Sequence, residues 1–347
     1  MSASSIRRVR LYEHGGPERL QFETAPLPEP GPGEVRIRME AVALNHLDLW
    51  VRRGVPGARF PLPLVVGSDG AGTVDRLGEG VRGLQLGQRV CVLPGLGCGH
   101  CLACHQGRDN ECPDYKILGE STDGTTAEAI VIPASNLMAA PENLDAVQAA
   151  SFGLTFLTAW NMLIHKARLQ PGQTVLIHAG ASGVSAAAIQ IARQLGALVA
   201  ATASSETKRD LATRLGADAV LPSRDPEWFQ AARRFSPQGF DVVFDHVGAD
   251  TFAPSLRLLR KGGRYVFCGA TSGFELKTDF RVVFFKNLEI LGSTMGRKAD
   301  LRQIAALFAA GRLVPTVDRV FAFDELAEAH RQLEERHVSG KIVVTIQ

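Results

Sequence analysis

The chain of 347 residues is 45% hydrophobic and 21% charged, with a formal net charge of +2 at pH 7. This length exceeds what one hydrophobic core usually supports, so the sequence predicts two domains. The balanced charge argues against a nucleic-acid-binding surface, and no apolar run of about 18 residues is present to cross a bilayer. Because the basic start around Arg7 lacks the apolar segment of a secretory signal, we expect a cytoplasmic protein with small-molecule partners.

Short alternating apolar segments fill residues 8 to 95, among them EVRIRMEAVAL and QRVCVLP. Glycine and proline separate these segments, as in PLPEPGPGE. Alternation of this kind, with frequent turn residues, predicts an antiparallel domain rich in β-strands. A further strand-like run, AEAIVIP, follows at residues 127 to 133.

Four of the six cysteines lie within the polar segment GCGHCLACHQGRDNEC, residues 97 to 112. They are Cys98, Cys101, Cys104 and Cys112, in the spacing C-x2-C-x2-C-x7-C. Neighbours this close are poor disulfide partners, whereas four soft ligands around one metal predict a closed structural zinc site. An iron–sulfur cluster uses the same ligands, and incidental cysteines are the other alternative. A closed site has no open position for substrate, so we expect it to stabilise the fold.

From about residue 150, strands alternate with helices of about ten residues. SFGLTFLTAWNMLI (151–164) reads as a helix, TVLIHAG (174–180) as a strand, VSAAAIQIARQLG (184–196) as a helix and LVAATAS (198–204) as the next strand. Three further strands are predicted, DAVLP, FDVVFDHVG and RYVFCGA, with helices between them. Such alternation predicts βαβ units and a doubly wound parallel sheet. The residues after about 297 contain a helix pair and the final strand GKIVVTI, too little to fold alone, so we expect them to return to the first domain.

A glycine-containing turn, HAGASGVS, joins the first of these strands to its helix. Against the dinucleotide pattern G-x-G-x-x-G, Gly180 takes the first place, Ser182 the second and Ser185 the third, with Gly183 as an extra glycine. The match is degenerate, and a plain tight turn explains it about as well. Its position in a βαβ unit favours a cofactor site, where helix amides receive a pyrophosphate.

The segment ATASSETKR after the second strand carries no acidic residue to bind the ribose of NAD. Ser204 and Ser205 offer hydroxyl groups, and Lys208 and Arg209 offer positive charge for a 2′-phosphate. We therefore expect NADP in preference to NAD. The alternative is that Ser205 caps a helix whose cations face solvent.

The cysteine spacing, together with GSDGAGTV, LTFLTAW, KGGRYVFCGA and GKIVVTI, resembles the medium-chain dehydrogenase/reductase superfamily along the whole chain. The resemblance implies a GroES-like catalytic domain at residues 1–152, with a structural zinc lobe at about 95–115. It implies a Rossmann NAD(P)-binding domain at 153–296 and a return to the catalytic domain at 297–347. It also implies homodimers or homotetramers paired through the Rossmann-sheet edge near LEILGST.

Zinc alcohol dehydrogenases of this superfamily hold a second, catalytic zinc. The resemblance places Asn45 at the first cysteine ligand, Ser68 at the histidine, Ser151 at the last cysteine and Asp69 at a nearby glutamate. Zinc prefers nitrogen and sulfur donors, so we do not expect a catalytic zinc. The pattern is similar to the quinone oxidoreductase branch, although many members of that branch lack the cysteine lobe that this chain keeps.

Without a zinc ion to polarise a carbonyl, the acceptor must itself be electrophilic, as quinones and α,β-unsaturated carbonyls are. The sequence therefore predicts NADPH-dependent hydride transfer to such an acceptor. Asn45 would donate a hydrogen bond to the developing oxyanion, assisted by Ser68 or Ser151, while Asp48 would hold hydrogen bonds of the site. For each residue the alternative is a structural polar side chain.

The resemblance also implies a set of cofactor contacts. They are Gly180, Ser182, Gly183 and Val184 at the turn, Ser204 and Lys208 near the adenosine phosphate, Thr155, Val247, Gly269 and Ala270 near the nicotinamide, and His46 and Lys341 at the pyrophosphate. His46 is alternatively a substitute metal ligand or a surface histidine. Two rival functions remain open: an alcohol dehydrogenase or carbonyl reductase with an unconventional metal site or none, and an NADP-binding structural protein without turnover.

Overall fold

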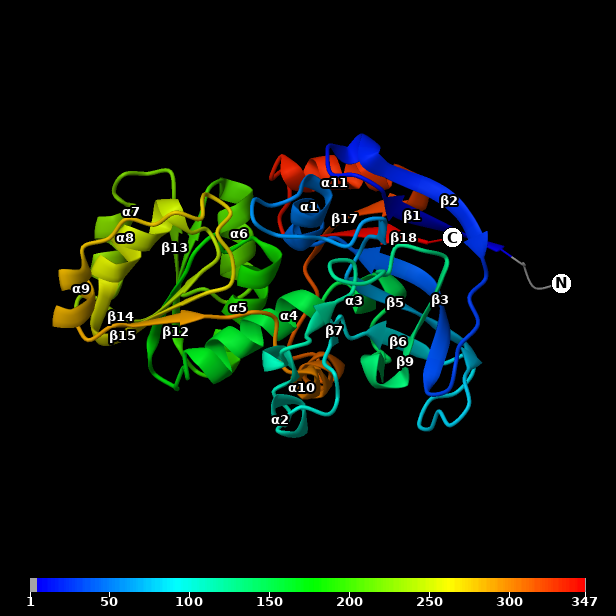
Figure 1. Ribbon diagram of the computed structural model, residues 1–347. Helices are drawn as coiled ribbons and strands as arrows, with labels where there is room; N and C mark the ends of the chain where they lie inside the picture. The colour runs from blue at the N-terminus through cyan, green and yellow to red at the C-terminus, as the bar shows by residue number, and fades with distance from the viewer. Residues whose placement is uncertain (1–4, 347) are drawn as a thin grey trace. The chain divides into compact units, whose positions relative to one another are not determined.

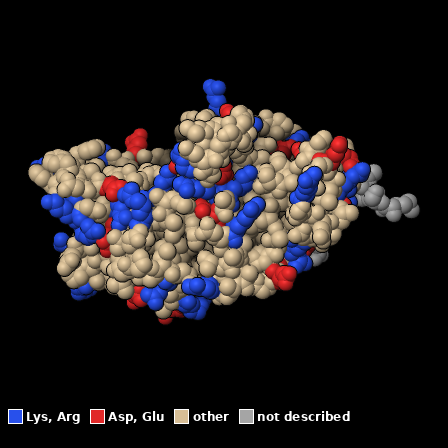
Figure 2. Space-filling view, turned by 90° about the horizontal axis from the view of Figure 1, so that it is seen from below, with Lys and Arg blue, Asp and Glu red and all other residues tan. Residues whose placement is uncertain are grey.

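The computed structural model describes residues 5–346. Its contacts divide the chain into a first unit, Met1–Leu154 with Arg297–Gln347, and a second unit, Thr155–Gly296. Among the described residues, none of the helices combines the length and apolarity needed to cross a membrane. Figure 2 shows lysine and arginine side chains on one face interrupted by carboxylates and by wide uncharged areas, so that face carries no continuous basic surface.

The first unit is built mainly from antiparallel sheets. Its strands are β1 (Ser5–Leu11), β2 (Leu20–Pro26), β3 (Glu34–Ala43), β4 (Leu64–Val65), β5 (Asp69–Leu77), β6 (Arg89–Val92), β7 (Gly95–Leu96), β8 (Lys116–Ile117), β9 (Ala129–Pro133), β10 (Leu137–Ala139), β17 (Val317–Ala322) and β18 (Lys341–Thr345). Its helices are α1 (His46–Arg53), α2 (Leu102–His105), α3 (Ala146–Ala150), α10 (Lys298–Ala309) and α11 (Leu326–Glu334), with short 3₁₀ turns at Pro17–Arg19, Asp109–Glu111, Ala134–Asn136 and Phe323–Glu325.

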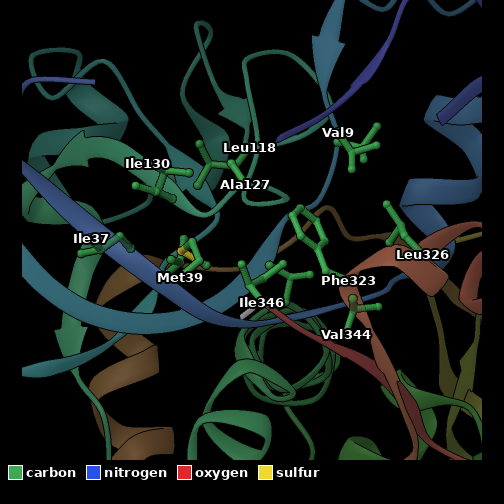
Figure 3. Packing of buried hydrophobic residues seen from close by; sticks show 14 of the residues in the cluster. Val9, Ile37, Met39, Leu118, Ala127, Ile130, Phe323, Leu326, Val344 and Ile346 are labelled. Atoms are coloured by element: carbon green, nitrogen blue, oxygen red, sulfur yellow. The ribbon is translucent and has the colours of Figure 1, made fainter. Parts of the chain in front are cut away.

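The largest sheet of this unit runs in the order β10-β6-β5-β3-β18-β17, with β9 also paired to β3. Strand β18 pairs antiparallel to β3, so the end of the chain is inserted beside a strand of the first fifty residues. Figure 3 shows the consequence in the core, where Phe323, Val344 and Ile346 from the tail lie among Met39 and Ala127 from the earlier strands. Burial of these apolar side chains holds the two chain segments in one core.

The second unit is a doubly wound α/β domain. Its strands are β11 (Thr174–Ile177), β12 (Leu198–Ala203), β13 (Ala219–Pro222), β14 (Phe240–Asp245), β15 (Leu259–Phe267) and β16 (Glu289–Gly292). Its helices are α5 (Gly183–Gln194), α6 (Glu206–Arg214), α7 (Trp228–Phe235), α8 (Ala249–Leu258) and α9 (Phe280–Phe285); α4 (Gly153–Trp160) and a π-helical turn at Asn161–Lys166 lead into it.

All neighbouring strands of this six-stranded sheet are parallel, in the order β13-β12-β11-β14-β15-β16. Helices α5 and α6 cover one face of the sheet, and α7 and α8 cover the other (Figure 1). The strand order reverses between β11 and β14, which is the switch point where doubly wound sheets bind ligands outside the carboxyl ends of their strands. The predicted fold class, a GroES-like β-rich domain with a Rossmann domain, is confirmed.

Two local predictions differ from the structure. The tail contains a strand that was not predicted, β17, which pairs parallel to β18 across helix α11. The predicted helix SFGLTFLTAWNMLI is interrupted, because its end winds into the π-helical turn Asn161–Lys166. The alternation in VDRVFA is short, and all six of its side chains are fully or partly exposed, so its hydrophobic signal is weak.

Candidate active site and metal centre

The four cysteines of the first unit form one cluster. Each offers a sulfur atom, and these atoms all lie within 4.8 Å of one another. Tetrahedral zinc–thiolate bonds of about 2.3 Å place sulfur atoms about 3.8 Å apart, so the cluster fits a zinc ion. It is the single group of three or more histidine, cysteine or acidic ligands with metal-site geometry found within residues 5–346.

Local backbone geometry positions the sulfur atoms. The amide of Cys98 donates to Cys112 Sγ at 3.4 Å, and that of Cys104 donates to Cys101 Sγ at 3.5 Å. Gly97 allows close packing, since a Cβ there would lie 2.8 Å from Cys104 Sγ. The His100 amide, donating to the Cys98 sulfur, lowers the pKa of that thiol to about 6, which favours the thiolate that a metal binds.

The cysteine lobe is fixed to helix α10 by Asp109. Its Oδ1 accepts a hydrogen bond of 3.0 Å from the Lys298 amide at the start of that helix. Lys298 Nζ in turn donates to Asn136 Oδ1 at 3.0 Å. The four-cysteine cluster is therefore tied to the returning tail of the chain as well as to its own loop.

The dinucleotide turn of the second unit lies between β11 and α5. Gly180 packs tightly, because a Cβ there would meet those of Ala201 at 3.0 Å and Ala212 at 3.3 Å. Ser182 caps the helix by accepting from the Ser185 amide, and Gly183 begins the helix. The free amides at this N-terminus, at the switch point of the sheet, can receive a pyrophosphate.

A histidine that the sequence analysis did not select contacts this turn. His246 Nε2 lies 2.8 Å from Ser182 Oγ and 3.1 Å from Ser185 Oγ. It directly follows β14, the neighbour of β11 in the sheet. Its position at the carboxyl end of a strand could have predicted this contact from the sequence, because ligands of doubly wound sheets bind at those strand ends.

The remaining predicted cofactor contacts of the second unit occupy strand ends and a helix start. Val247 follows β14, and its amide donates to Asp245 Oδ1 at 2.6 Å. Gly269 and Ala270 follow β15. Thr155 is buried, and its hydroxyl has no hydrogen-bond partner in the part of the chain that the structure describes. Their roles toward a cofactor stay predictions, as does that of Val184 in the first turn of α5.

Both interpretations of the segment after β12 remain compatible with the structure. Ser205 caps α6 by accepting from the Lys208 amide at 3.4 Å, as the helix-cap alternative expects. Ser204 and Lys208 are half-buried at the carboxyl end of β12, where an adenosine ribose lies in Rossmann domains.

A second polar cluster, formed by Asn45, Asp48, Asp69 and Lys341, is buried in the first unit. None of these residues is more than 5% exposed. Lys341 Nζ donates to Asn45 Oδ1 at 2.5 Å and to Asp69 Oδ2 at 3.1 Å. Asn45 Nδ2 donates to Asp69 Oδ2 at 3.0 Å and to the Ala43 carbonyl at 3.3 Å. A buried ion pair and an amide thus form one connected network, which we call the Lys341 cluster.

Asp48 belongs to this cluster through the first turn of α1. Its Oδ2 accepts a hydrogen bond of 2.6 Å from the Asn45 amide. Burial raises the pKa of Asp48 to about 6, and the ammonium of Lys341 opposes that shift. His46 is the first residue of α1, where its ring meets the edge of Trp50 at a centroid distance of 5.2 Å.

The residues aligned with the family's catalytic zinc ligands do not fit a zinc ion. Asn45 Oδ1 already accepts from the Lys341 ammonium. Ser151 Oγ donates to the Gln148 carbonyl at 2.8 Å, and Ser68 Oγ is buried with no hydrogen-bond partner within residues 5–346. No thiolate or imidazole is present at these three positions, whereas zinc binds through such donors.

Comparisons with known proteins agree with this architecture. The alcohol dehydrogenase GroES-like domain matches residues 31–142, and the zinc-binding dehydrogenase family matches residues 215–344. A crystal structure of an NAD-dependent alcohol dehydrogenase is 48% identical, covers 98% of this chain and 100% of its own, and has a TM-score of 0.95.

Two curated relatives span nearly the whole chain. Crotonyl-CoA carboxylase/reductase of Cereibacter sphaeroides is 31% identical over 100% of this chain and 88% of its own length. Quinone oxidoreductase of Rattus norvegicus is 28% identical over 97% of this chain and 96% of its own. The chain therefore belongs to the medium-chain dehydrogenase/reductase superfamily, in the zinc-type alcohol dehydrogenase-like group of NAD(P)-dependent oxidoreductases.

Proposed function

We propose that this protein transfers a hydride from NADPH to an electrophilic carbonyl acceptor, a quinone or an α,β-unsaturated carbonyl compound, without a catalytic zinc. The observation that carries the proposal is the donor set at Asn45, Ser68 and Ser151, which offers a zinc ion no sulfur or nitrogen ligand. An unactivated ketone needs a Lewis acid, whereas conjugated acceptors spread the incoming charge into an enolate or phenolate.

Two relatives support this choice of acceptor. The first is named crotonyl-CoA carboxylase/reductase, and crotonyl-CoA is an α,β-unsaturated thioester. The second is named quinone oxidoreductase. Both kinds of compound place the negative charge of the reduced product on oxygen, where a few hydrogen bonds can stabilise it.

In this proposal the cofactor is held by the second unit. The amides of Gly183 and Val184 at the start of α5 meet the pyrophosphate, with Ser182 beside them. Ser204 and Lys208 meet the 2′-phosphate that distinguishes NADP from NAD. The bound nucleotide supplies the hydride. The four-cysteine cluster holds one zinc ion, which stabilises its lobe and takes no part in the reaction.

The proposal is tested by following NADPH oxidation with a panel of quinones and enones, beside alcohol oxidation with NAD⁺ and NADP⁺. We expect turnover with the conjugated acceptors and one zinc ion per chain by metal analysis. A second tightly bound zinc ion, or turnover confined to simple alcohols, would contradict the proposal. Nucleotide binding with no turnover across the panel would favour a structural protein instead.

A second candidate is an alcohol dehydrogenase that uses NAD. The 48% identity to a solved NAD-dependent alcohol dehydrogenase favours it. The same assays separate the two functions, because an alcohol dehydrogenase would oxidise primary or secondary alcohols and would prefer NAD⁺ to NADP⁺.

We also propose that the protein forms homodimers through the edge of the parallel sheet, alone or within a homotetramer. Strand β16 is the last strand of that sheet, and Ile290 on it is 41% exposed. In the preceding helix α9, Phe280, Phe284 and Phe285 are 72%, 57% and 69% exposed. An open strand edge beside exposed aromatic side chains is the surface that a second copy would cover.

A further inference from the structure

The Lys341 cluster brings a cation to the residues that align with the family's metal ligands. Lys341 Nζ donates to Asn45, at the place of the first zinc ligand, and to Asp69, at the place of the nearby glutamate. Its side chain is 3% exposed and that of Asp69 is fully buried. A lysine ammonium thus holds the positive charge of this site.

The hydrogen bonds determine which group is available to a substrate oxygen. An ammonium has only donors, so its contact with Asn45 identifies the facing atom as the amide oxygen. Both hydrogens of Asn45 Nδ2 then point to acceptors, Asp69 Oδ2 and the Ala43 carbonyl. Lys341 Nζ has three hydrogens and two acceptors among the described residues, which leaves it one hydrogen to donate.

Burial makes this cation effective. The electrostatic attraction between two charges is stronger in a buried site than in water, because the effective dielectric constant is lower. An ammonium held by two fixed acceptors also needs little reorganisation when negative charge develops beside it. Ser68 Oγ is a buried hydroxyl of the same unit with no hydrogen-bond partner among the described residues, so it can also donate a hydrogen bond. Asp69 supplies the counter-charge that keeps the ammonium in place.

We propose that Lys341 is the catalytic electrophile of this enzyme: its ammonium donates a hydrogen bond to the carbonyl oxygen of the conjugated acceptor and stabilises the negative charge that develops there. This inference rests on the proposed function. The nicotinamide nucleotide is oxidised by two electrons as its hydride forms a C–H bond with the acceptor. The π electron pair moves to oxygen, where Lys341 stabilises it, and a proton from water completes the reduced product.

The test compares Lys341→Met with wild type over enones of graded electrophilicity and over quinones. If the ammonium stabilises the oxyanion, kcat of the variant falls by about 10²–10³-fold for the least electrophilic enones and much less for quinones. A plot of log kcat against acceptor electrophilicity is then steeper for the variant than for wild type. NADPH affinity, measured by fluorescence titration, stays within about threefold of wild type.

Several variants keep the outcome interpretable. The double variant Lys341→Met, Asp69→Asn removes both charges of the buried pair, which restores folding if the single variant is unstable. In this double variant, log kcat must depend on acceptor electrophilicity as steeply as in the single variant. Lys341→Arg keeps the charge and is expected to recover part of kcat. Lys286→Met is the matched control, because Lys286 donates to backbone carbonyls of the second unit.

Three results would overturn the inference: an unchanged dependence on electrophilicity in the folded variants, a uniform loss over all acceptors, or a weakened NADPH affinity with kcat retained. The last result would place Lys341 at the cofactor pyrophosphate. Wild-type protein that reduces no quinone or enone refutes the proposed function itself, so failure of one proposal is distinguishable from failure of the other.

Discussion

Asp48 is a carboxyl group enclosed by protein. Burial raises its pKa from 3.8 to about 6, so between these pH values the folded state keeps a proton that the unfolded chain has released. The stability that this group contributes is therefore fully present below about pH 3.8 and is lost as the pH rises to about 6. The shift corresponds to about 3 kcal/mol.

Asp48→Asn should remove this dependence, because its amide oxygen can still accept from the Asn45 amide and no charge is buried. We expect the free energy of unfolding of the variant to rise relative to that of wild type by about 2 kcal/mol between pH 4.5 and pH 7.5, because part of the shift acts below pH 4.5. Urea denaturation of both proteins at the two pH values measures the difference. A gap that stays constant with pH would show that Asp48 titrates normally.

In the proposed function, the ammonium of Lys208 binds the 2′-phosphate and so favours NADP over NAD. We expect Lys208→Ala to raise the KM for NADPH by about tenfold, the effect of losing one charge-assisted contact to phosphate, and to leave the KM for NADH unchanged. Arg214→Ala, an exposed cation in the last turn of the same helix, is the control. Equal changes for both nucleotides would remove Lys208 from the 2′-phosphate site.

At the scale of single elements, the proposed zinc ion would stabilise the cysteine lobe, whose short helix has little packing of its own. Helix α2 spans only Leu102–His105 and buries none of its residues. We expect Cys104→Ser to lose the one zinc ion and to lower Tm by at least about 5 °C, since a structural metal contributes several kcal/mol. Metal analysis and calorimetry check both effects, with Cys268→Ser as control. Retained zinc would contradict the assignment.

The elements show what a sequence can and cannot predict. Alternating strands and helices in the second unit follow from hydrophobic period, and each predicted strand from TVLIHAG to RYVFCGA is present. Strand β17 was missed because its side chains are largely exposed, which erases the apolar alternation. The π-helical turn after α4 has no periodic signal of its own, since its residues continue the apolar pattern of the helix.

The candidate site was predictable only in its residue types. The sequence places Asn45, Ser68 and Ser151 at positions where a zinc enzyme has ligands, and it identifies the four-cysteine spacing. The resemblance assigns Lys341 to a cofactor pyrophosphate, which stays a prediction, and the structure adds its contacts with Asn45 and Asp69. Contacts between residues so distant in the chain depend on sheet pairing, here of β18 with β3, which no local pattern encodes.

At the scale of the molecule, the open edge of the parallel sheet predicts the oligomeric state. We expect Ile290→Lys to dissociate the proposed dimer, because it places a charge on the edge strand β16. Light scattering after size-exclusion chromatography measures the mass. Val320→Lys changes an apolar residue of the first unit that is 51% exposed, against 41% for Ile290, and serves as control. A wild-type mass of one chain would contradict the proposed dimer.

The pairing of β18 with β3 sets the order in which the protein can be completed. Lys341 and Asn45 are 296 residues apart, and the whole second unit is translated between them. While a ribosome makes that unit, β3 has no β18 beside it, and the partial first unit exposes a strand edge and apolar surface to solvent. We infer that the second unit, which is continuous in the chain, folds first during synthesis and that the site of the first unit is assembled last.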